Sequence, residues 1–335
     1  MLPAIFGLTG KVLSADERAF FRDVEPTGYI LFGRNCGDRS QVRALTDELR
    51  ELSGRDDLPI LIDQEGGQVA RLKPPEWPEL PGAAIFDRLY RRAPISAIQA
   101  MHHHGRAIAA QLREVGVSVN CAPLLDLAHP GAHAIIKQRA LGACPMQVAA
   151  LGRAMLEGMR AGGVVGILKH MPGHGRATAD SHLELPVVNA SEAEMDIDIE
   201  PFRKLAWAPI GMTAHIVCTG WDATSCATLS TDVIDTVIRG RIGFDGLLIS
   251  DDIGMGALSG GFAERASAAI AAGCDLVLHC SGELADMQSA AEGLHEISEA
   301  ATARLDHALG WAAGAEEKQS FDELASRRDQ LLAYA

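Results

Sequence analysis

The chain has 335 residues, of which 47% are hydrophobic and 22% charged, so it is long enough for a large α/β domain with a substantial buried core. Its formal net charge is −14, and its Lys and Arg residues form no basic stripe, which argues against a nucleic-acid partner. No apolar run approaches the roughly 18 residues that a membrane-spanning helix requires, so no membrane partner is expected.

The seven cysteines are odd in number and have no CxxC spacing, a pattern typical of buried thiols rather than of a disulfide framework. The first residues, MLPAIFGLTGKVLSADERAFF, lack the basic start and the long apolar run of a secretory leader. We therefore expect a cytoplasmic protein.

Short apolar runs recur along the chain, each separated from the next by a longer amphipathic or charged segment. Near-continuous apolar runs that alternate with helices are typical of a parallel sheet. The expected strands are Ala4–Leu8, Tyr29–Phe32, Ile60–Asp63, Val117–Cys121, Val165–Lys169, Ile210–His215, Leu247–Ser250 and Leu276–His279. The expected helices are Ser14–Arg22, Gln41–Leu52, Ile95–Val115, Met146–Ala161, Ala190–Ala206, Thr231–Arg241, Gly261–Ala272 and the tail beyond about Ser281.

Polar side chains stand at or just after the carboxyl end of nearly every expected strand. In a (β/α)₈ barrel those ends converge on one face, which carries the active site. A doubly wound sheet would gather ligands only near its switch point. We therefore predict an α/β fold, a (β/α)₈ TIM barrel, with residues 1–335 forming a single domain. The strand-end residues are Arg34, Asp63, Asp126, Lys169, His170, His215, Asp251 and His279.

The segment KHMPGHGRATADSH, from Lys169 to His182, contains three histidines and an aspartate but no helical pattern, so we expect a loop. Two chemistries fit it. The first is a zinc site made by His170, His174, Asp180 and His182 with His102–His104 or His215, although no HExxH pattern is present. The second, which we favour, is acid–base chemistry. Asp180 and His182 are one residue apart, so the carboxylate could orient the imidazole in an extended loop.

The segment FDGLLISDDIGM ends an apolar strand with two consecutive carboxylates, Asp251 and Asp252. Successive strand side chains point to opposite faces, so one carboxylate can enter the barrel mouth squarely. We expect this to be Asp251, and we expect Asp252 to be structural, for example as the cap of the next helix.

The segment LIDQEGGQVAR places Asp63 at a strand end before two glycines. Gly-Gly allows the backbone to approach a ligand closely, and the carboxylate could accept two sugar hydroxyls. A tight turn with a solvated acid is the alternative.

IDQEGG, KHMPGHG followed by DSH, and SDD resemble, in this order and spacing, glycoside hydrolase family 3 and its single-domain NagZ-type β-N-acetylglucosaminidases. The resemblance extends from GYILFGRN (Gly28–Asn35) through APLLDL (Ala122–Leu127) to AGCDLVL (Ala272–Leu278). It implies that Asp251 is the nucleophile, His182 the general acid/base and Asp180 its dyad partner. It also implies that the sugar is held by Asp63, Arg71, Arg139, Lys169 and His170.

Two positions depart from the family pattern. Met171 replaces the usual Phe of KHFPGHG, and IIKQRALG around Arg139 matches the family's IGxRxFG only loosely.

The resemblance implies a retaining exo-β-N-acetylglucosaminidase that acts on the saccharide GlcNAc–1,6-anhydro-MurNAc, with or without stem peptide, in peptidoglycan recycling. We expect a monomer that needs neither a metal nor an organic cofactor. One alternative is a phosphorylase with the same site, since an anion enters more easily beside imidazole than beside a carboxylate. The other is a zinc-dependent barrel hydrolase.

Overall fold

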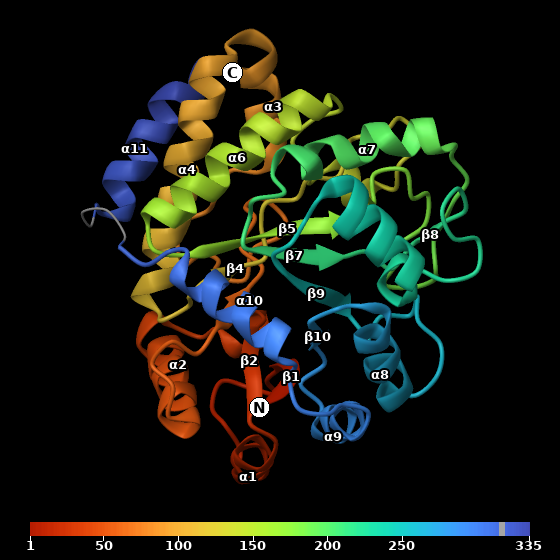
Figure 1. Ribbon diagram of the computed structural model, residues 1–335. Helices are drawn as coiled ribbons and strands as arrows, with labels where there is room; N and C mark the ends of the chain where they lie inside the picture. Colours follow the sequence, from red (N-terminus) through yellow and green to blue (C-terminus); the bar gives the residue numbers. More distant parts are fainter. Residues whose placement is uncertain (315–318) are drawn as a thin grey trace.

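The computed structural model describes residues 1–314 and 319–335, and within them eight parallel strands close into a barrel (Figure 1). Around the barrel the strands follow the order β1-β10-β9-β7-β5-β4-β3-β2, so each lies between its neighbours in the chain. The predicted (β/α)₈ barrel is confirmed. The strands are β1 (Leu2–Gly7), β2 (Pro26–Leu31), β3 (Ile60–Ile62), β4 (Val119–Asn120), β5 (Val165–Met171), β7 (Ile210–Thr213), β9 (Leu247–Asp252) and β10 (Leu276–His279).

The barrel interior is a packed apolar core that is closed at one end. Helix α10 (Glu299–Gly310) covers the amino-terminal end of the strands, because its Leu305 and Ala308 join the interior cluster. Asp275, just before β10, accepts hydrogen bonds from Arg239 at 3.0 Å and from Arg304 of α10 at 2.9 Å. The barrel can therefore receive a ligand at the opposite end, where the strands finish. The interior residues include Ile5, Ile30, Leu61, Val119, Val165, Ile167, Ile210, Leu247 and Ile249.

Helices surround the barrel (Figure 1). The first of them begins as its sequence predicts, since Ser14 and Glu17 form a reciprocal capping box. The small strands β6 (Val187–Val188) and β8 (Val217–Cys218) pair with each other outside the barrel. The helices are α1 (Ala15–Val24), α2 (Arg39–Ser53), α3 (Ala83–Arg92), α4 (Pro94–Glu114), α5 (Ala134–Lys137), α6 (Pro145–Ala161), α7 (Glu192–Lys204), α8 (Phe262–Ala272), α9 (Leu284–Glu292) and α11 (Phe321–Leu332), with the 3-10 turns η1 (Gly33–Asn35) and η2 (Ala227–Leu229) and the π-helix η3 (Val233–Ile242).

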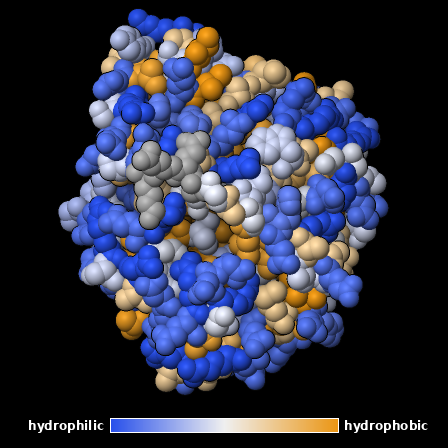
Figure 2. Space-filling view, turned by 60° about the vertical axis from the view of Figure 1, so that its left-hand side comes forward, coloured by the Kyte–Doolittle hydropathy of each residue, from blue (hydrophilic) through white to orange (hydrophobic). Residues whose placement is uncertain are grey.

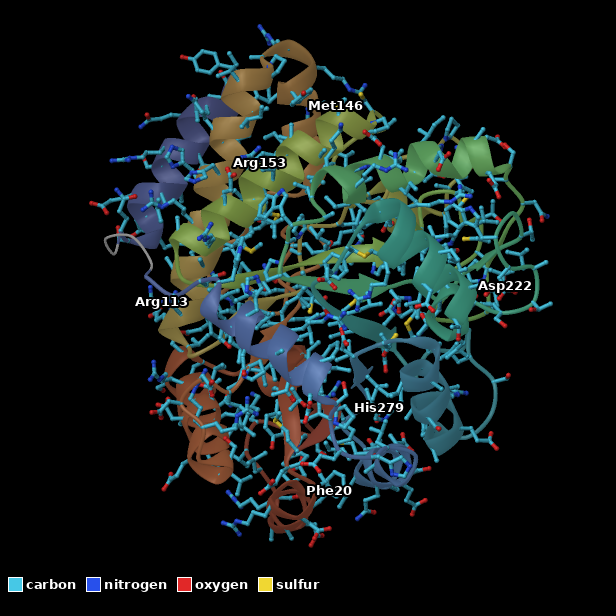
Figure 3. The ribbon with its side chains drawn as sticks, in the orientation of Figure 1. Phe20, Arg113, Met146, Arg153, Asp222 and His279 are labelled. Atoms are coloured by element: carbon cyan, nitrogen blue, oxygen red, sulfur yellow. The ribbon has the colours of Figure 1, made fainter. Side chains whose placement is uncertain are left out.

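The face of the molecule that Figure 2 draws is mostly polar. Figure 2 shows a face on which apolar groups are scattered among hydrophilic ones. On α6, the side chains of Met146 and Arg153 are exposed and point away from the barrel (Figure 3). Within residues 1–314 and 319–335, no helix combines the length and the apolar character needed to cross a bilayer.

Several element boundaries differ from the sequence expectations. β4 has two residues instead of the five of Val117–Cys121, whereas β5 continues two residues past Lys169. Helix α3 was not predicted, because its N-cap is Gly82, which provides no side-chain cap and hence no start signal. The tail beyond Ser281 forms α9, α10 and α11, as expected.

All seven cysteines are free thiols, as predicted. Four of them are buried, but Cys144 is exposed and Cys36 and Cys280 are partly exposed, so the expectation of burial is wrong for these three. The four buried thiols are Cys121, Cys218, Cys226 and Cys274.

The close approach of α4 and α6 generates a stability prediction. A Cβ on Gly105 of α4 would lie 2.5 Å from the carbonyl oxygen of Met155 on α6. We expect Gly105→Ala to lower the free energy of unfolding by about 1–3 kcal/mol through overpacking. Denaturant unfolding with an unchanged m-value would measure this loss. Gly310→Ala is the matched control, because a Cβ there meets nothing within 4 Å. A loss of equal size in both variants would contradict the packing argument.

Candidate active site

A cavity of about 320 Å³ opens at the carboxyl ends of the barrel strands. All eight residues that the sequence singled out as site residues line it. They come from the ends of β5 and β9, from the position just after β3, and from the loops after β3, β4 and β5. The fold thus brings the predicted residues together, while their individual roles stay predictions. The eight are Asp63, Arg71, Arg139, Lys169, His170, Asp180, His182 and Asp251.

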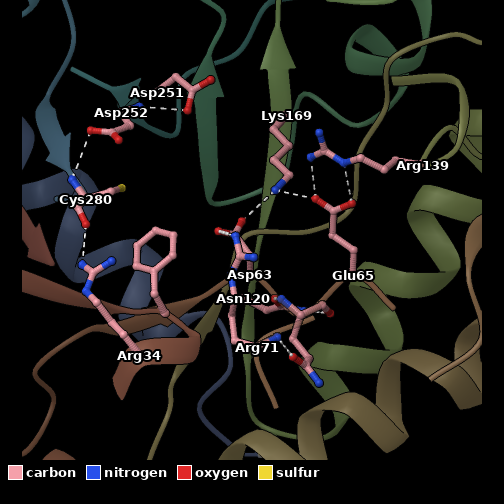
Figure 4. A network of polar contacts seen from close by, with 12 residues as sticks. Arg34, Asp63, Glu65, Arg71, Asn120, Arg139, Lys169, Asp251, Asp252 and Cys280 are labelled. Atoms are coloured by element: carbon pink, nitrogen blue, oxygen red, sulfur yellow. Dashed lines mark hydrogen bonds and ion pairs between the residues drawn. The ribbon is translucent and has the colours of Figure 1, made fainter. Parts of the chain in front are cut away.

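Five charged side chains form a chain of alternating sign, and all of them except Glu65 line this cavity (Figure 4). Arg71 Nη2 lies 3.0 Å from Asp63 Oδ2, and Lys169 Nζ lies 3.0 Å from Asp63 Oδ1. The same Lys169 Nζ lies 2.7 Å from Glu65 Oε1. Arg139 then donates two hydrogen bonds to Glu65, at 2.9 and 2.7 Å. We call these five residues the charge chain.

The two carboxylates and the ammonium of the charge chain are ionised at neutral pH. Burial by itself would raise the pKa of the Asp63 and Glu65 carboxyls, but Lys169 and the two arginines outweigh it. They hold the pKa of Asp63 well below its usual range and lower that of Glu65 to about 2. Burial likewise opposes the charge on Lys169, yet the two carboxylates raise the pKa of its ammonium above its ordinary value. Such fixed donors and acceptors can bind the hydroxyls of a sugar.

Glu65 is the site residue that sequence reasoning missed. It lies in the quoted IDQEGG segment, two residues after Asp63, and that spacing was the available signal. The prediction of Arg139, in contrast, was based on a loose motif match. The structure places its side chain in the cavity wall, where it donates two hydrogen bonds to Glu65.

His170 is oriented by a second buried carboxylate. Its Nδ1 lies 2.8 Å from Asp126 Oδ2, and the backbone N–H of His174 donates to Asp126 Oδ1 at 2.6 Å. This pairing occupies Nδ1, so Nε2 of His170 is the ring nitrogen left for the cavity. The His174 ring contacts Ser181 Oγ at 3.2 Å and therefore ties the start of the loop after β5 to its far end.

Asp251, the last residue but one of β9, is an ionised carboxylate. Burial would raise its pKa, but the His170 and His215 rings, the backbone N–H of Asp252 and Lys169 lower it below the ordinary 3.8. The Asp252 N–H donates to Asp251 Oδ1 at 2.8 Å. A partly buried, ionised carboxylate at a cavity wall is suited to nucleophilic attack.

Asp252 is structural, as expected, but it does not cap a helix. Its Oδ1 accepts from the backbone N–H of Gly254 at 2.8 Å and of Cys280 at 3.1 Å, so it joins β9 to the end of β10 (Figure 4). The expected cap is wrong, because α8 starts ten residues after Asp252 and has Gly261 at its N-cap.

Asp180 and His182 make the hydrogen bond that their spacing predicts. His182 Nδ1 lies 2.8 Å from Asp180 Oδ1, which also accepts the backbone N–H of His182 at 3.0 Å. Burial would raise the pKa of Asp180, but these two hydrogen bonds lower it. The His182 side chain is 60% exposed, and with Nδ1 engaged its Nε2 can exchange protons with a ligand.

The loop that carries this pair is held by the segment after β9. Gly256 N–H donates to the carbonyl of His182 at 3.1 Å, and Ala257 N–H donates to that of Ser181 at 3.2 Å. The segment that follows the strand of Asp251 therefore positions the histidine as well. A Cβ on Gly256 would lie 2.8 Å from the Leu183 carbonyl oxygen and 2.9 Å from that of His182.

Three of the other strand-end residues stabilise the fold. His215 contacts Thr228 Oγ1 and the Asp252 carbonyl, at 2.8 and 2.9 Å. Arg34 donates to the carbonyls of Leu8 and Cys280, and the ring of His279 lies against α8 (Figure 3). Among the residues that the structure describes, no three His, Cys, Asp or Glu side chains group as ligands for a metal ion.

Comparisons with known proteins agree with this geometry. Residues 9–310 match the sequence model of the family described as Glycosyl hydrolase family 3 N terminal domain. The chain belongs to glycoside hydrolase family 3. A beta-hexosaminidase of Alkalilimnicola ehrlichii is 39% identical over 284 residues, which cover 83% of this chain and 80% of that protein. A beta-hexosaminidase of Xylella fastidiosa is 37% identical over 314 residues, 92% of each chain.

The fold has a close counterpart within glycoside hydrolase family 3. The crystal structure of NagZ from Neisseria gonorrhoeae in complex with N-trifluoroacetyl-D-glucosamine superposes with a TM-score of 0.87 at 28% identity, covering 99% of this chain and 98% of that one. The predicted NagZ type is therefore confirmed, and so is the prediction of a hydrolase of the β-N-acetylhexosaminidase type.

The charge chain generates a prediction about stability and pH. Glu65→Gln leaves Lys169 and Arg139 buried beside a neutral group, so we expect a loss of about 3–5 kcal/mol in the free energy of unfolding at neutral pH. The folded-state pKa of Glu65 is depressed, so the stability that it contributes is present above its ordinary 4.5 and is lost as the pH falls toward about 2. The difference between wild type and variant should therefore shrink over that window.

Glu157→Gln is the matched control. Glu157 pairs with Arg153 one helical turn earlier, and both side chains are about half exposed. We expect a loss of no more than about 0.5 kcal/mol there. Equal losses at positions 65 and 157, or a Glu65 effect that does not vary with pH, would contradict the assigned network.

Proposed function

We propose that the protein is a retaining exo-β-N-acetylglucosaminidase that releases terminal GlcNAc from GlcNAc–1,6-anhydro-MurNAc, with or without stem peptide, in peptidoglycan recycling. The observation that carries the proposal is one cavity lined by the ionised Asp251, by the Asp180–His182 pair and by four members of the charge chain, Asp63, Arg71, Arg139 and Lys169. The Neisseria gonorrhoeae NagZ complex with N-trifluoroacetyl-D-glucosamine supports an N-acylated glucosamine as the sugar held there.

In this mechanism Asp251 attacks the anomeric carbon while His182 Nε2 gives its proton to the leaving oxygen, and the glycosidic bond breaks. The imidazole then takes a proton from water, whose oxygen displaces the Asp251 carboxylate. Two displacements give net retention. Asp180 holds the ring by Nδ1 and stabilises its protonated form, as a carboxylate does in a catalytic triad.

Asp63, Arg71, Arg139, Lys169 and His170 hold the sugar in this proposal. Asp63 accepts hydrogen bonds from hydroxyls, and the cationic side chains donate them. The cavity of about 320 Å³ lies at the lower end of the range for small-molecule sites, about 300–1,000 Å³, which favours a single sugar. The exposed His182 lies where the leaving group would reach solvent, so a second sugar with a peptide can be accommodated.

The enzyme would work as a monomer in the cytoplasm. Its unpaired cysteines suit a reducing compartment. The scattered apolar groups on the face drawn in Figure 2 also favour a monomer, since stable oligomer interfaces are more apolar.

Two variants test the catalytic roles. We expect Asp251→Ala to lower turnover at least about 10⁴-fold on every substrate, because no nucleophile remains. We expect His182→Ala to lose about 10²–10⁴-fold on a natural disaccharide, because the leaving oxygen then lacks its proton donor. On 4-nitrophenyl β-N-acetylglucosaminide, whose leaving group departs without protonation, the loss should be much smaller. Rates of GlcNAc and nitrophenol release measure both.

His307→Ala, an exposed histidine on α10, is the control for loss of an imidazole and should keep full activity. Equal losses of the His182 variant on both substrates would refute the proton-donor role.

Product analysis in phosphate buffer should give GlcNAc, whereas GlcNAc-1-phosphate would mean phosphorolysis. Activity should also survive exhaustive chelation, and its loss would favour the zinc-dependent reaction.

Gly256→Ala tests the support of the histidine loop. The added methyl would meet the carbonyls of His182 and Leu183 and push the loop outward. We expect up to about a hundredfold loss in kcat on the disaccharide, with little loss on the nitrophenyl glycoside, since misplacement of about 1 Å can have that effect. Gly261→Ala, where a Cβ meets nothing within 4 Å, should leave both rates unchanged. If the two glycine variants behave alike, the loop contact does not position His182.

A further inference from the structure

A second cavity, of about 370 Å³, lies beside the sugar cavity. The two share Arg139, which therefore lies between them, and its partner Glu65, 2.7 Å away, lines the second cavity. Most of the second cavity is bounded by the loop after β3, by α3 and by α4. None of the proposed catalytic steps uses it.

The amino-terminal end of α3 faces this second cavity. Residues 83–86, the first turn of the ten-residue helix, line it, and the N-cap Gly82 provides no side-chain hydrogen bond. The first N–H groups of an α-helix have no partner within the helix and carry a partial positive charge. They form a ready site for an anion when a cavity lies in front of them.

A buried histidine in the same wall is a second, independent sign of a missing ligand. His104 of α4 lines the cavity and is 1% exposed. Its Nε2 lies near the Glu65 carbonyl but reaches no partner in hydrogen-bond geometry. Its Nδ1 faces Arg328 Nη1 at 3.4 Å, and because a guanidinium can only donate, Nδ1 accepts.

The proton of this neutral ring therefore sits on Nε2. Burial, followed by the nearby Arg328 charge, lowers the pKa of His104 to about 3, so the ring is uncharged at neutral pH. A buried N–H donor without an acceptor is unfavourable, so an acceptor supplied by a ligand would satisfy it.

The remaining lining groups set the chemistry of that ligand. Arg88, exposed at the edge of the cavity, adds a positive charge, and Glu65 is already neutralised by Arg139 and Lys169. The rest of the wall is largely apolar. A ligand with one negative end and a short hydrocarbon body matches this combination of donors and apolar walls. The apolar side chains are Ile85, Phe86, Met101, Leu124, Leu141 and Met155.

We infer that this second cavity is a binding site for a small carboxylate with a short apolar chain. The carboxylate accepts hydrogen bonds from the α3 N-terminus and from His104 Nε2, with Arg88 at the entrance, and the chain lies against the apolar wall. The site is separate from the sugar cavity and does not depend on the proposed glycosidase mechanism.

Calorimetric titration with hexanoate tests the inference, on the full chain with the sugar cavity filled by N-acetylglucosamine. We expect hexanoate to bind and hexanamide, its neutral analogue, to bind at least about tenfold more weakly, a difference of about 1.4 kcal/mol. Arg88→Gln should weaken hexanoate binding by about threefold to fivefold, because an exposed charge contributes modestly. His104→Leu should weaken it further, with the unfolding midpoint measured to show that the variant folds.

Arg92→Gln is the matched control, since it removes the same charge from the far end of α3, outside the cavity lining. Its hexanoate affinity should equal that of the wild type. Three outcomes would overturn the inference: no hexanoate binding at millimolar concentrations, equal binding of hexanamide, or equal effects of the Arg88 and Arg92 variants.

Discussion

Two carboxylates, Asp63 and Glu65, can be buried in the barrel mouth because three cations surround them. Taking an unpaired ion out of water costs several kcal/mol, and each of these ions has at least one partner within 3.0 Å. The partners come from β5, from the loop after β3 and from the loop after β4. The charge chain therefore fixes three strand ends relative to one another. Its ordering is completed during folding, so a sugar meets donors and acceptors that are already in place.

The charges of the charge chain also limit which side chains can serve as the nucleophile and which as the proton donor. The charge chain holds three cations and two carboxylates, which leaves an excess positive charge in the wall that Asp251 shares. Burial opposes the charge on Asp251, but the neighbouring His170 and His215 rings, together with Lys169 of this wall, lower its pKa and keep it ionised. A second carboxylate as proton donor would add negative charge near Asp251 and work against this balance. An imidazole on an exposed loop avoids the conflict, since its neutral form adds no charge.

Most of the architecture could be predicted because the barrel strands are apolar runs of ordinary length, and polar residues mark their ends. The ends of a strand were less predictable where pairing with neighbouring strands, rather than the strand's own sequence pattern, decides its length. In β4, two paired residues suffice because β3 and β5 enclose them. Helix α3 has no capping side chain, so its start left no local signal. Asp252 looked like a helix cap because it precedes a helix, but its contact with Cys280, just after the neighbouring strand β10, cannot be seen in the sequence.

The site shows the same division between local and long-range information. Asp180 and His182 are two residues apart, so their contact follows from spacing, whereas Glu65 meets Arg139 across 74 positions of the chain. Sequence reasoning treated His102–His104 as possible metal ligands, yet the third of these histidines lies in the wall of the cavity next to the sugar site. There Nε2 of this histidine has no hydrogen-bond partner among the described residues, and the N-cap of α3 makes no side-chain hydrogen bond. The constraint that shaped the charge chain, that buried polar groups need partners, is met there within the protein itself. In the second cavity, which shares Arg139 with the sugar site, it calls for a ligand.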